Sequence, residues 1–563
     1  MQSRLYATLI HTAKIGFFSV SSKYFPQNLL FFDKKKVVSI LFAIFAIQKH
    51  ANIFMIYKID SKRKKAAKDA EEIGTSKELY YFLYEACNIL RGPVSQDAFK
   101  EYITPLLYFK RISDVYDEET KAALAISDGD EEFASLPEQH RFVIPAGCHW
   151  NDIRERTTDI GSAIIGAMRQ IEFANPMTLY GVLSVFSTAN WSNKNVFSDE
   201  KLRDLIEHMS KRRLGNLDYA ADLMGDAYEM LLKKFADFLK AKAGEFYTPR
   251  SVVRLLVRIL DPKPGETVYD PACGSGGMLI EAVHHMKNDE QCCGAIFGQE
   301  KNVTNAAVAK MNLFLHGAND FNIMCGDTLR DPKILANEHL AHFDCVIANP
   351  PFSLKNWGAE AWKTDRYGRN LWGTPSDTVG DYAWLQHMIC SMRSKSGRMA
   401  VVLPQGVLFR GNEEGRIREE LVKHDYVESI ITLGDKLFYG TGLSPCLFII
   451  RDEKPAEHKG KVLMIDGSKI LTPQRAQNIL SDDDVDELYR LYKAYDDEED
   501  RSAVVTISQI AEKDYDLSPN KYVKYHKEEV KPYSAVLAEF KAAYQQMIDA
   551  EKKFRDILNR EAV

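Results

Sequence analysis

The sequence lacks the cysteine and histidine spacings that mark zinc sites and redox motifs. Its nine cysteines include no C-x-x-C pair, and none of its 14 histidines pair at metal-ligand spacing. Several of the cysteines lie inside apolar, strand-like runs. This usage favours reduced, buried thiols over a disulfide framework. We therefore expect no metal site, and we expect a cytoplasmic protein.

Long apolar runs are also missing from the N-terminal segment. The longest uncharged apolar run in residues 1–57, from Val37 to Ile47, has 11 residues, whereas a membrane-spanning helix needs about 20. We therefore expect no membrane association and treat residues 1–60 as an extension peripheral to the fold, with Met55 as a plausible alternative start. A membrane anchor is the alternative interpretation of this segment.

Positive charge is scarce beyond that segment. Residues 1–65 carry 12 basic and 2 acidic residues, and the remainder carries 61 basic and 77 acidic residues, a net charge of −16. A protein that gripped DNA alone through the phosphate backbone would usually be basic overall. If this chain acts on nucleic acid, local patches or a partner must supply the positive field.

Apolar periodicity divides the remaining sequence into a helical part and a mixed part. Between Lys77 and about Phe235 the apolar residues recur at helical spacing. Beyond Gly244, helical patterns at 277–287, 302–315, 381–393 and 413–424 alternate with short β-rich runs, which predicts a parallel sheet covered on both faces. The expected strands are Thr267–Asp270, Ala295–Gln299, Phe321–Cys325, Asp344–Ala348, Met399–Leu403, Val427–Thr432 and Cys446–Ile450.

These patterns predict four parts: the extension 1–60, a helical domain at 74–215, a sheet domain at 218–525 and a C-terminal helix at 526–563. The tail 534–559 is a charged amphipathic helix. Its apolar side consists of Val536, Phe540, Tyr544, Ile548 and Phe554.

A glycine-rich loop follows the first expected strand and opens a helix. It contains Asp270, Gly274, Ser275, Gly276 and Gly277. Glycines let the backbone approach a ligand closely, and a helix N-terminus favours the negative end of that ligand. The spacing is not G-x-G-x-x-G, and no G-x-x-x-x-G-K-[ST] occurs, so a dinucleotide site and an ATP-driven motor are disfavoured.

Acidic side chains lie at the end of the second expected strand and just after the third. Glu300 is placed to accept both ribose hydroxyls of a nucleoside, and Asp327 could accept an adenine amino group. Any one of these groups could belong to an ordinary turn. Three successive strand ends with suitable groups favour a nucleoside site, because ligands of such sheets bind at the carboxyl ends of the strands.

The fourth expected strand ends in Asn349-Pro350-Pro351-Phe352. The Asn349 amide oxygen and the Pro350 carbonyl together can accept both hydrogens of one exocyclic amine. Two such acceptors favour a more tetrahedral, more nucleophilic nitrogen. Phe352 supplies a face on which a base can stack, and a base in a duplex must leave the stack to reach it. A strand that is merely stopped by proline is the structural alternative.

At these residues the sequence resembles S-adenosylmethionine-dependent DNA methyltransferases that methylate amino groups, and more closely the modification (M) subunit of type I restriction–modification systems. Asp270–Gly277, Glu300 and Asn349–Phe352 resemble the family's glycine loop, second-strand acid and catalytic tetrapeptide. Leu79–Asp114 resembles its helical N-terminal domain. The resemblance covers roughly residues 77–560. The stretch similar to the family's cofactor motif is Glu245-Phe246-Tyr247-Thr248-Pro249-Arg250.

The resemblance implies an α/β fold, with a Rossmann-like class I S-adenosylmethionine-dependent methyltransferase sheet and an N-terminal helical domain. It implies transfer of a methyl group from S-adenosyl-L-methionine to N6 of adenine in double-stranded DNA. It implies that Glu245–Arg250, Ser275–Gly277 and Glu300 hold this cofactor. It further implies partners, namely a specificity (S) subunit that selects the sequence, a restriction (R) subunit and two M subunits in one complex.

Three alternatives stay open. The chain could be a stand-alone DNA adenine methyltransferase, a methyltransferase for RNA or protein glutamine, or a non-catalytic scaffold. A cytosine C5 enzyme would need a nucleophilic cysteine just after the fourth strand, and the only Pro-Cys, at Cys446, opens a late apolar strand. The loop Phe352–Asp381 interleaves aromatic and basic residues, which suits either a DNA-facing lid or a loop packed over the sheet edge.

Overall fold

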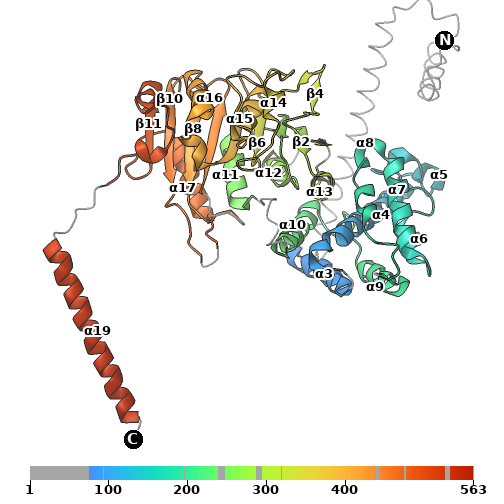
Figure 1. Cartoon of the computed structure of the whole chain (residues 1–563). Coiled ribbons are helices and arrows are strands. Elements are labelled where there is room, and N and C mark those ends of the chain that lie inside the picture. Colours follow the sequence, from blue (N-terminus) through green and yellow to red (C-terminus); the bar gives the residue numbers. More distant parts are fainter. Residues whose placement is uncertain are drawn as a thin grey trace, which may run out of the picture. The chain divides into compact units, whose positions relative to one another are not determined.

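The structure is a computed structural model, and it describes nine stretches of the chain (Figure 1). The predicted extension 1–60, Met55 and the residues Glu245, Phe246 and Tyr247 lie outside the described residues. The described stretches are residues 75–92, 94–195, 197–238, 248–286, 294–318, 320–438, 444–474, 477–526 and 533–561.

The first part of the described chain is helical, as its periodicity predicts. The first helix begins at a capping box, in which the Thr75 hydroxyl accepts from Glu78 N and the Glu78 carboxylate accepts from Thr75 N, so two otherwise unpaired N–H groups are satisfied. The α-helices here are α3 (Ser76–Leu90), α4 (Lys100–Ile126), α5 (Glu131–Ala134), α6 (Trp150–Arg154), α7 (Ile160–Ala174), α8 (Pro176–Leu179), α9 (Asp199–Ser210) and α10 (Ala221–Phe238).

A nine-stranded sheet forms the second part. The strands lie in the order β11-β10-β8-β9-β7-β6-β1-β2-β3. A separate hairpin joins β4 (Leu335–Ala336) to β5 (His339–Leu340). The bounds are β1 (Val268–Asp270), β2 (Ile296–Glu300), β3 (Phe321–Cys325), β6 (Cys345–Ala348), β7 (Arg398–Pro404), β8 (Val427–Leu433), β9 (Pro445–Arg451), β10 (Lys461–Gly467) and β11 (Ser502–Thr506).

Helices cover both faces of this sheet. Successive residues of a strand point to opposite faces. Cys345 and Ile347 of β6 accordingly pack into the layer of α11 (Arg250–Leu260), α12 (Gly277–Met286) and α17 (Asp482–Ala494). Val346 and Ala348 pack into the layer of α15 (Asp381–Cys390), α16 (Asn412–Lys423) and α18 (Ile507–Ala511). Strands buried on both faces explain the continuous apolar runs in the sequence.

The predicted α/β fold class is confirmed, with two corrections to the sheet. The sheet is not purely parallel, because β9 lies antiparallel between β7 and β8, and β11 is antiparallel to β10. Strands β10 and β11 and helix α17 were not predicted. Charged residues flank or interrupt these segments and hide their short apolar runs.

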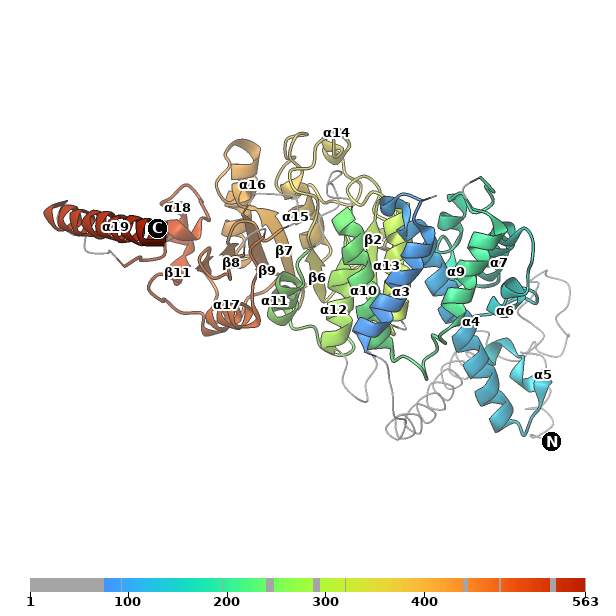
Figure 2. The same ribbon diagram turned by 90° about the horizontal axis from the view of Figure 1, so that it is seen from below.

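The cores of the helical part and of the sheet part share one helix. The apolar side chains of α10 belong to the helical core, and so do Met311 and Phe314 of α13 (Val303–Leu315). The Phe314 ring meets the Tyr108 ring of α4 edge-on, with centroids 5.0 Å apart. Helices α3, α10 and α13 lie side by side (Figure 2). The boundary between 215 and 218 therefore stays a prediction, since α10 and α13 belong to a common core.

The remaining described elements are the short helix α14 (Ala359–Trp362) and the C-terminal helix α19 (Tyr533–Glu561). The described part of α19 exposes Phe540, Tyr544, Met547 and Ile548. Among the described helices, none is both long enough and apolar enough to cross a bilayer.

Candidate active site

The candidate site lies where the strand order reverses. From β1 the chain proceeds outward to β2 and β3 and then returns to β6 on the other side of β1. In open α/β sheets, ligands bind outside the carboxyl ends of the strands at this switch point. A pocket here is lined both by Asp270 and the loop after β1 and by Asn349, directly after β6. The predicted glycine loop and catalytic tetrapeptide therefore meet at one site.

The glycine loop is built by close backbone contacts. Gly274 and Gly276 have φ values of +53° and +84°, which favour glycine. A Cβ on Gly276 would lie 3.4 Å from the Ala309 Cβ of α13, so the loop rests directly on that helix. The Asp270 carboxylate accepts a hydrogen bond from Ala272 N at 2.9 Å. Burial raises the pKa of Asp270 to about 8.

Glu300 reinforces the same loop. Its carboxylate accepts hydrogen bonds from Gly274 N at 3.0 Å and from Asn302 N at 2.7 Å. These bonds connect the end of β2 to the loop after β1. Asp327 follows β3 and forms an ion pair with Lys301 at 2.8 Å. The ribose and adenine contacts expected of Glu300 and Asp327 stay predictions, since neither residue lines the described pocket.

The Asn349 side chain is held in one orientation. Its Nδ2 donates to the Thr248 hydroxyl at 2.8 Å. Its Oδ1 is buried and receives no hydrogen bond from any described residue. A buried acceptor without a donor is costly and calls for a functional explanation. The resemblance assigns Thr248 to the cofactor, and the structure adds a contact with Asn349.

The end of the tetrapeptide is held by a ring contact and by a hydrogen bond to the next residue. Phe352 is half-buried, and its ring centroid lies 6.2 Å from that of Phe438. The next backbone amide, Ser353 N, donates to Asp381 Oδ1 at 2.8 Å. Asp381 is fully buried and is paired with Arg410. The loop is therefore tied to the N-terminus of α15 directly after the tetrapeptide.

The visible end of the predicted cofactor motif begins α11. Pro249 occupies the N-cap position of this helix. Arg250 lines the pocket and forms ion pairs with Glu229 at 2.6 Å and Asp226 at 3.0 Å, both on α10. The helical part of the chain thus contributes directly to the wall of the pocket.

Sequence reasoning missed several pocket residues. Asn312 on α13, Glu281 and His284 on α12, and Glu229 on α10 all line the pocket. Each lies in a helix with ordinary apolar periodicity, so no local pattern marks it. The only sequence signal is polarity in an otherwise buried helix, most clearly at Asn312, which is 1% exposed.

The aromatic and basic loop after the tetrapeptide is mostly packed. Trp357, Trp362 and Arg369 are buried, and the Arg369 guanidinium donates to the carbonyls of Thr328 and Leu329. For these residues the packed-loop interpretation is correct. The exposed cations of the loop are Lys355, Lys363 and Arg366.

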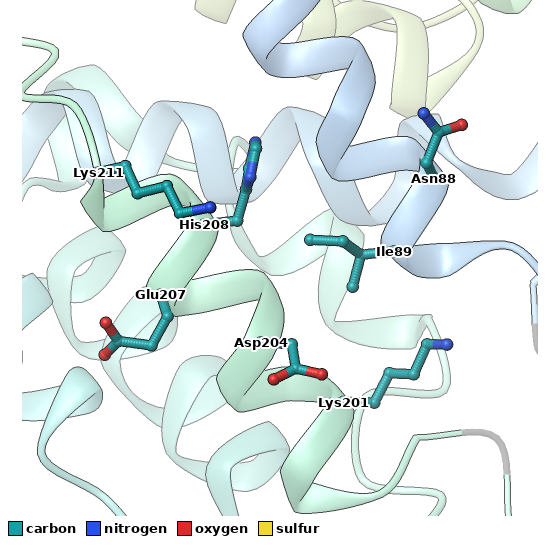
Figure 3. Close-up of a pocket in the computed structure, with 7 residues that line it drawn as sticks. All are labelled: Asn88, Ile89, Lys201, Asp204, Glu207, His208 and Lys211. Atoms are coloured by element: carbon teal, nitrogen blue, oxygen red, sulfur yellow. The ribbon is translucent and has the colours of Figure 1, made fainter.

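A second hollow, of about 470 Å³, lies on the helical part between α3 and α9 (Figure 3). Two of its polar side chains already have partners. Glu207 is paired with Arg154 at 2.7 Å, and the His208 ring contacts the Phe82 carbonyl at 2.9 Å. Glu207 and His208 are therefore engaged within the helical part. It is lined by Asn88, Ile89, Lys201, Asp204, Glu207, His208 and Lys211.

The cysteines do not suggest another chemistry. Within the described stretches all seven cysteines are free thiols, and no group of three potential metal ligands occurs there. Cys446 is buried in β9, and burial raises the pKa of its thiol. This placement agrees with the prediction that Cys446 is a core residue.

Comparison with known proteins identifies relatives for both parts of the chain. The family described as N-6 DNA Methylase matches residues 219–531, and the HsdM N-terminal domain matches residues 79–209. The type I restriction enzyme MjaVII methylase subunit of Methanocaldococcus jannaschii is 36% identical over 394 residues, covering 68% of this chain and 64% of the relative. The MjaVIII methylase subunit of the same organism is 30% identical over 501 residues, covering 83% and 82%.

A solved structure supports the same grouping. The type I restriction-modification system methyltransferase subunit from Streptococcus thermophilus superposes with a TM-score of 0.69 at 26% identity. The match covers 80% of this chain and all of that one.

Proposed function

The chain belongs to the N-6 DNA methylase family, among the methylase subunits of type I restriction enzymes, and on this premise we propose that Asn349–Phe352 carries out its chemistry. The reaction is methyl transfer to N6 of adenine in DNA. The observation that carries the assignment is the buried Asn349 Oδ1, which has no described donor at the switch point of the sheet.

Asn349 and Pro350 act on the adenine amine. The Asn349 Oδ1 accepts one N6 hydrogen, and the Pro350 carbonyl accepts the other. These bonds draw electron density toward N6 and favour its attack on an electrophilic carbon. Because Thr248 accepts from Asn349 Nδ2, the amide oxygen rather than the amide nitrogen is presented to the base.

Phe352 receives the flipped base. The base must leave the duplex stack, which costs a few kcal/mol, and stacking on an aromatic ring returns about 1–3 kcal/mol. The Phe438 ring lies behind Phe352 and limits its movement. Asp381 holds the following backbone amide, so the ring and the two acceptors keep a common position.

S-adenosyl-L-methionine is the proposed cofactor, and the pocket suits it. When bound, it supplies an electrophilic methyl group on a sulfonium. The glycine loop allows close backbone approach, while Glu300 and Asp327 are proposed to take the ribose hydroxyls and the adenine amine. Among the predicted cofactor residues, Thr248 and Arg250 line the pocket with Gly274, Ser275 and Gly277.

We propose that the chain works with partners in the cytoplasm. They are double-stranded DNA, a specificity subunit, a restriction subunit and a second M subunit. The net charge of −16 outside residues 1–65 supports dependence on another subunit for DNA affinity. The exposed side chains Phe540, Tyr544, Met547 and Ile548 of α19 form the proposed contact with the specificity subunit. Large exposed apolar groups commonly mark such interaction sites.

The catalytic assignment is tested with Asn349→Ala. Methyl transfer in the assembled complex should be abolished, while S-adenosylmethionine binding should persist. Asn151→Ala, at an exposed position of α6, is the matched control and should remain active. Near-normal transfer by Asn349→Ala would refute the assignment. Transfer to RNA or to a protein glutamine rather than to DNA would instead favour an alternative substrate.

A further inference from the structure

One pocket residue outside the tetrapeptide has a buried hydrogen-bond acceptor that receives no hydrogen bond from the described residues. Asn312 of α13 is 1% exposed and lines the pocket. Its Nδ2 donates to the Ser275 carbonyl of the glycine loop at 3.1 Å. Its Oδ1 is buried and receives no hydrogen bond from the described residues.

The orientation of this amide is determined by its surroundings. Exchanging the oxygen and nitrogen would place Oδ1 against the Ser275 carbonyl, and two acceptors repel each other. Helix α13 is also fixed on both sides. Ala309 touches the loop at Gly276, and a Cβ on Gly225 of α10 would lie 2.2 Å from the His316 ring. The amide of this pocket residue therefore keeps its orientation.

The charges around the pocket select the kind of donor that it can accept. Asp270, Glu229 and Glu281 contribute three carboxyl groups to the lining, whereas Arg250 is already paired with Glu229 and Asp226. The described lining therefore holds more carboxyl than guanidinium groups. A cationic N–H donor satisfies the Asn312 oxygen and suits a lining that is richer in carboxyl groups.

We propose that Asn312 binds the α-ammonium group of the cofactor's methionine moiety and so discriminates the complete amino-acid end from analogues that lack the amine. This inference rests on the proposed use of S-adenosylmethionine. The carboxylates at the ends of β2 and β3 are assigned to the nucleoside, which leaves the ammonium as the donor on the α13 side of the glycine loop.

The test compares two ligands in the full-length chain by calorimetry. S-adenosylhomocysteine carries the ammonium, and its deaminated 2-oxo analogue retains the carboxylate and the nucleoside. The unmodified protein should bind the first about 10- to 150-fold more tightly, the range for a charge-assisted hydrogen bond. Asn312→Leu should reduce this preference toward one. Asn305→Leu, half-buried at the start of the same helix, should retain it.

Several outcomes would overturn the proposal. Equal binding of both ligands by the unmodified protein would do so without any variant. A preference that survives in Asn312→Leu would also overturn the proposal. Loss of the Ser275 contact could damage the loop, but such damage weakens the binding of both ligands alike and leaves the preference between them unchanged. Binding of 5′-methylthioadenosine, which lacks the whole amino-acid end, reports that each variant is folded. If the unmodified protein binds none of the three ligands, the proposed cofactor itself is wrong.

Discussion

The hydrogen bond between Thr248 and Asn349 gives a direct test of how the Asn349 amide is oriented. Thr248→Val removes the hydroxyl that accepts from Asn349 Nδ2 at 2.8 Å and changes the side-chain volume little. The Asn349 amide can then rotate, and its oxygen no longer faces the base in every molecule. The Thr248 hydroxyl does not cap α11, because Pro249 is the N-cap of this helix and no side chain forms a capping hydrogen bond there.

The expected magnitude follows from the loss of one neutral hydrogen bond. Such a bond contributes about 0.5–1.5 kcal/mol, which corresponds to a decrease in kcat of about 2- to 13-fold. Thr248→Ser keeps the hydroxyl and should retain most of the turnover.

The assay is single-turnover methyl transfer by the assembled complex at saturating cofactor, with cofactor affinity measured separately. A lower rate at unchanged cofactor affinity supports the positioning role. Unchanged turnover in Thr248→Val would refute it. A decrease in cofactor affinity at an unchanged rate would show that Thr248 binds the cofactor and does not position Asn349.

Three further predictions concern carboxylates around the site. Glu300→Ala should weaken S-adenosylmethionine binding by about 1.5–3 kcal/mol and remove any preference over the 2′-deoxyribose analogue; unchanged calorimetric affinity would exclude Glu300 from the site. Asp270 has a pKa of about 8 when folded and about 3.9 when unfolded, so its stabilising contribution is complete below pH 4 and is lost as the pH rises toward 8. The urea midpoint of the unmodified protein should therefore fall relative to that of Asp270→Asn over this interval, and parallel pH profiles would contradict the raised pKa. Asp381→Asn removes the charge that pairs with Arg410 and should lower kcat without changing cofactor affinity; a normal kcat would show that Asp381 does not position the tetrapeptide.

The sequence predicts much of the sheet because its central strands are buried on both faces. All seven expected strands form, including Phe321–Cys325 with the predicted bounds. The directions of the strands could not be predicted from the sequence. The apolar run of β9 resembles the apolar runs of β7 and β8. The sequence therefore does not show that β9 lies between these two strands and is antiparallel to both.

The residues of the candidate site that lie at strand ends were predictable from the sequence. Asp270 ends β1 and Asn349 directly follows β6, and the carboxyl ends of these strands meet at the switch point. Asn312 and Glu229 were not predictable, because they reach the pocket from helices whose packing only the tertiary structure determines. The buried Trp357 and Trp362 illustrate the same limit, since composition alone does not separate a DNA-facing loop from a packed one.

The central claim is that this chain methylates adenine in DNA and depends on another subunit to select the sequence. The most direct measurement maps N6-methyladenine at every position of a defined DNA after incubation with the chain alone, with the chain plus its specificity subunit, and with Asn349→Ala plus that subunit. We expect weak, unselective methylation by the chain alone, N6-methyladenine at one bipartite sequence with the specificity subunit, and none with the variant. Efficient, site-specific methylation by the chain alone would contradict this account and indicate a self-sufficient methyltransferase.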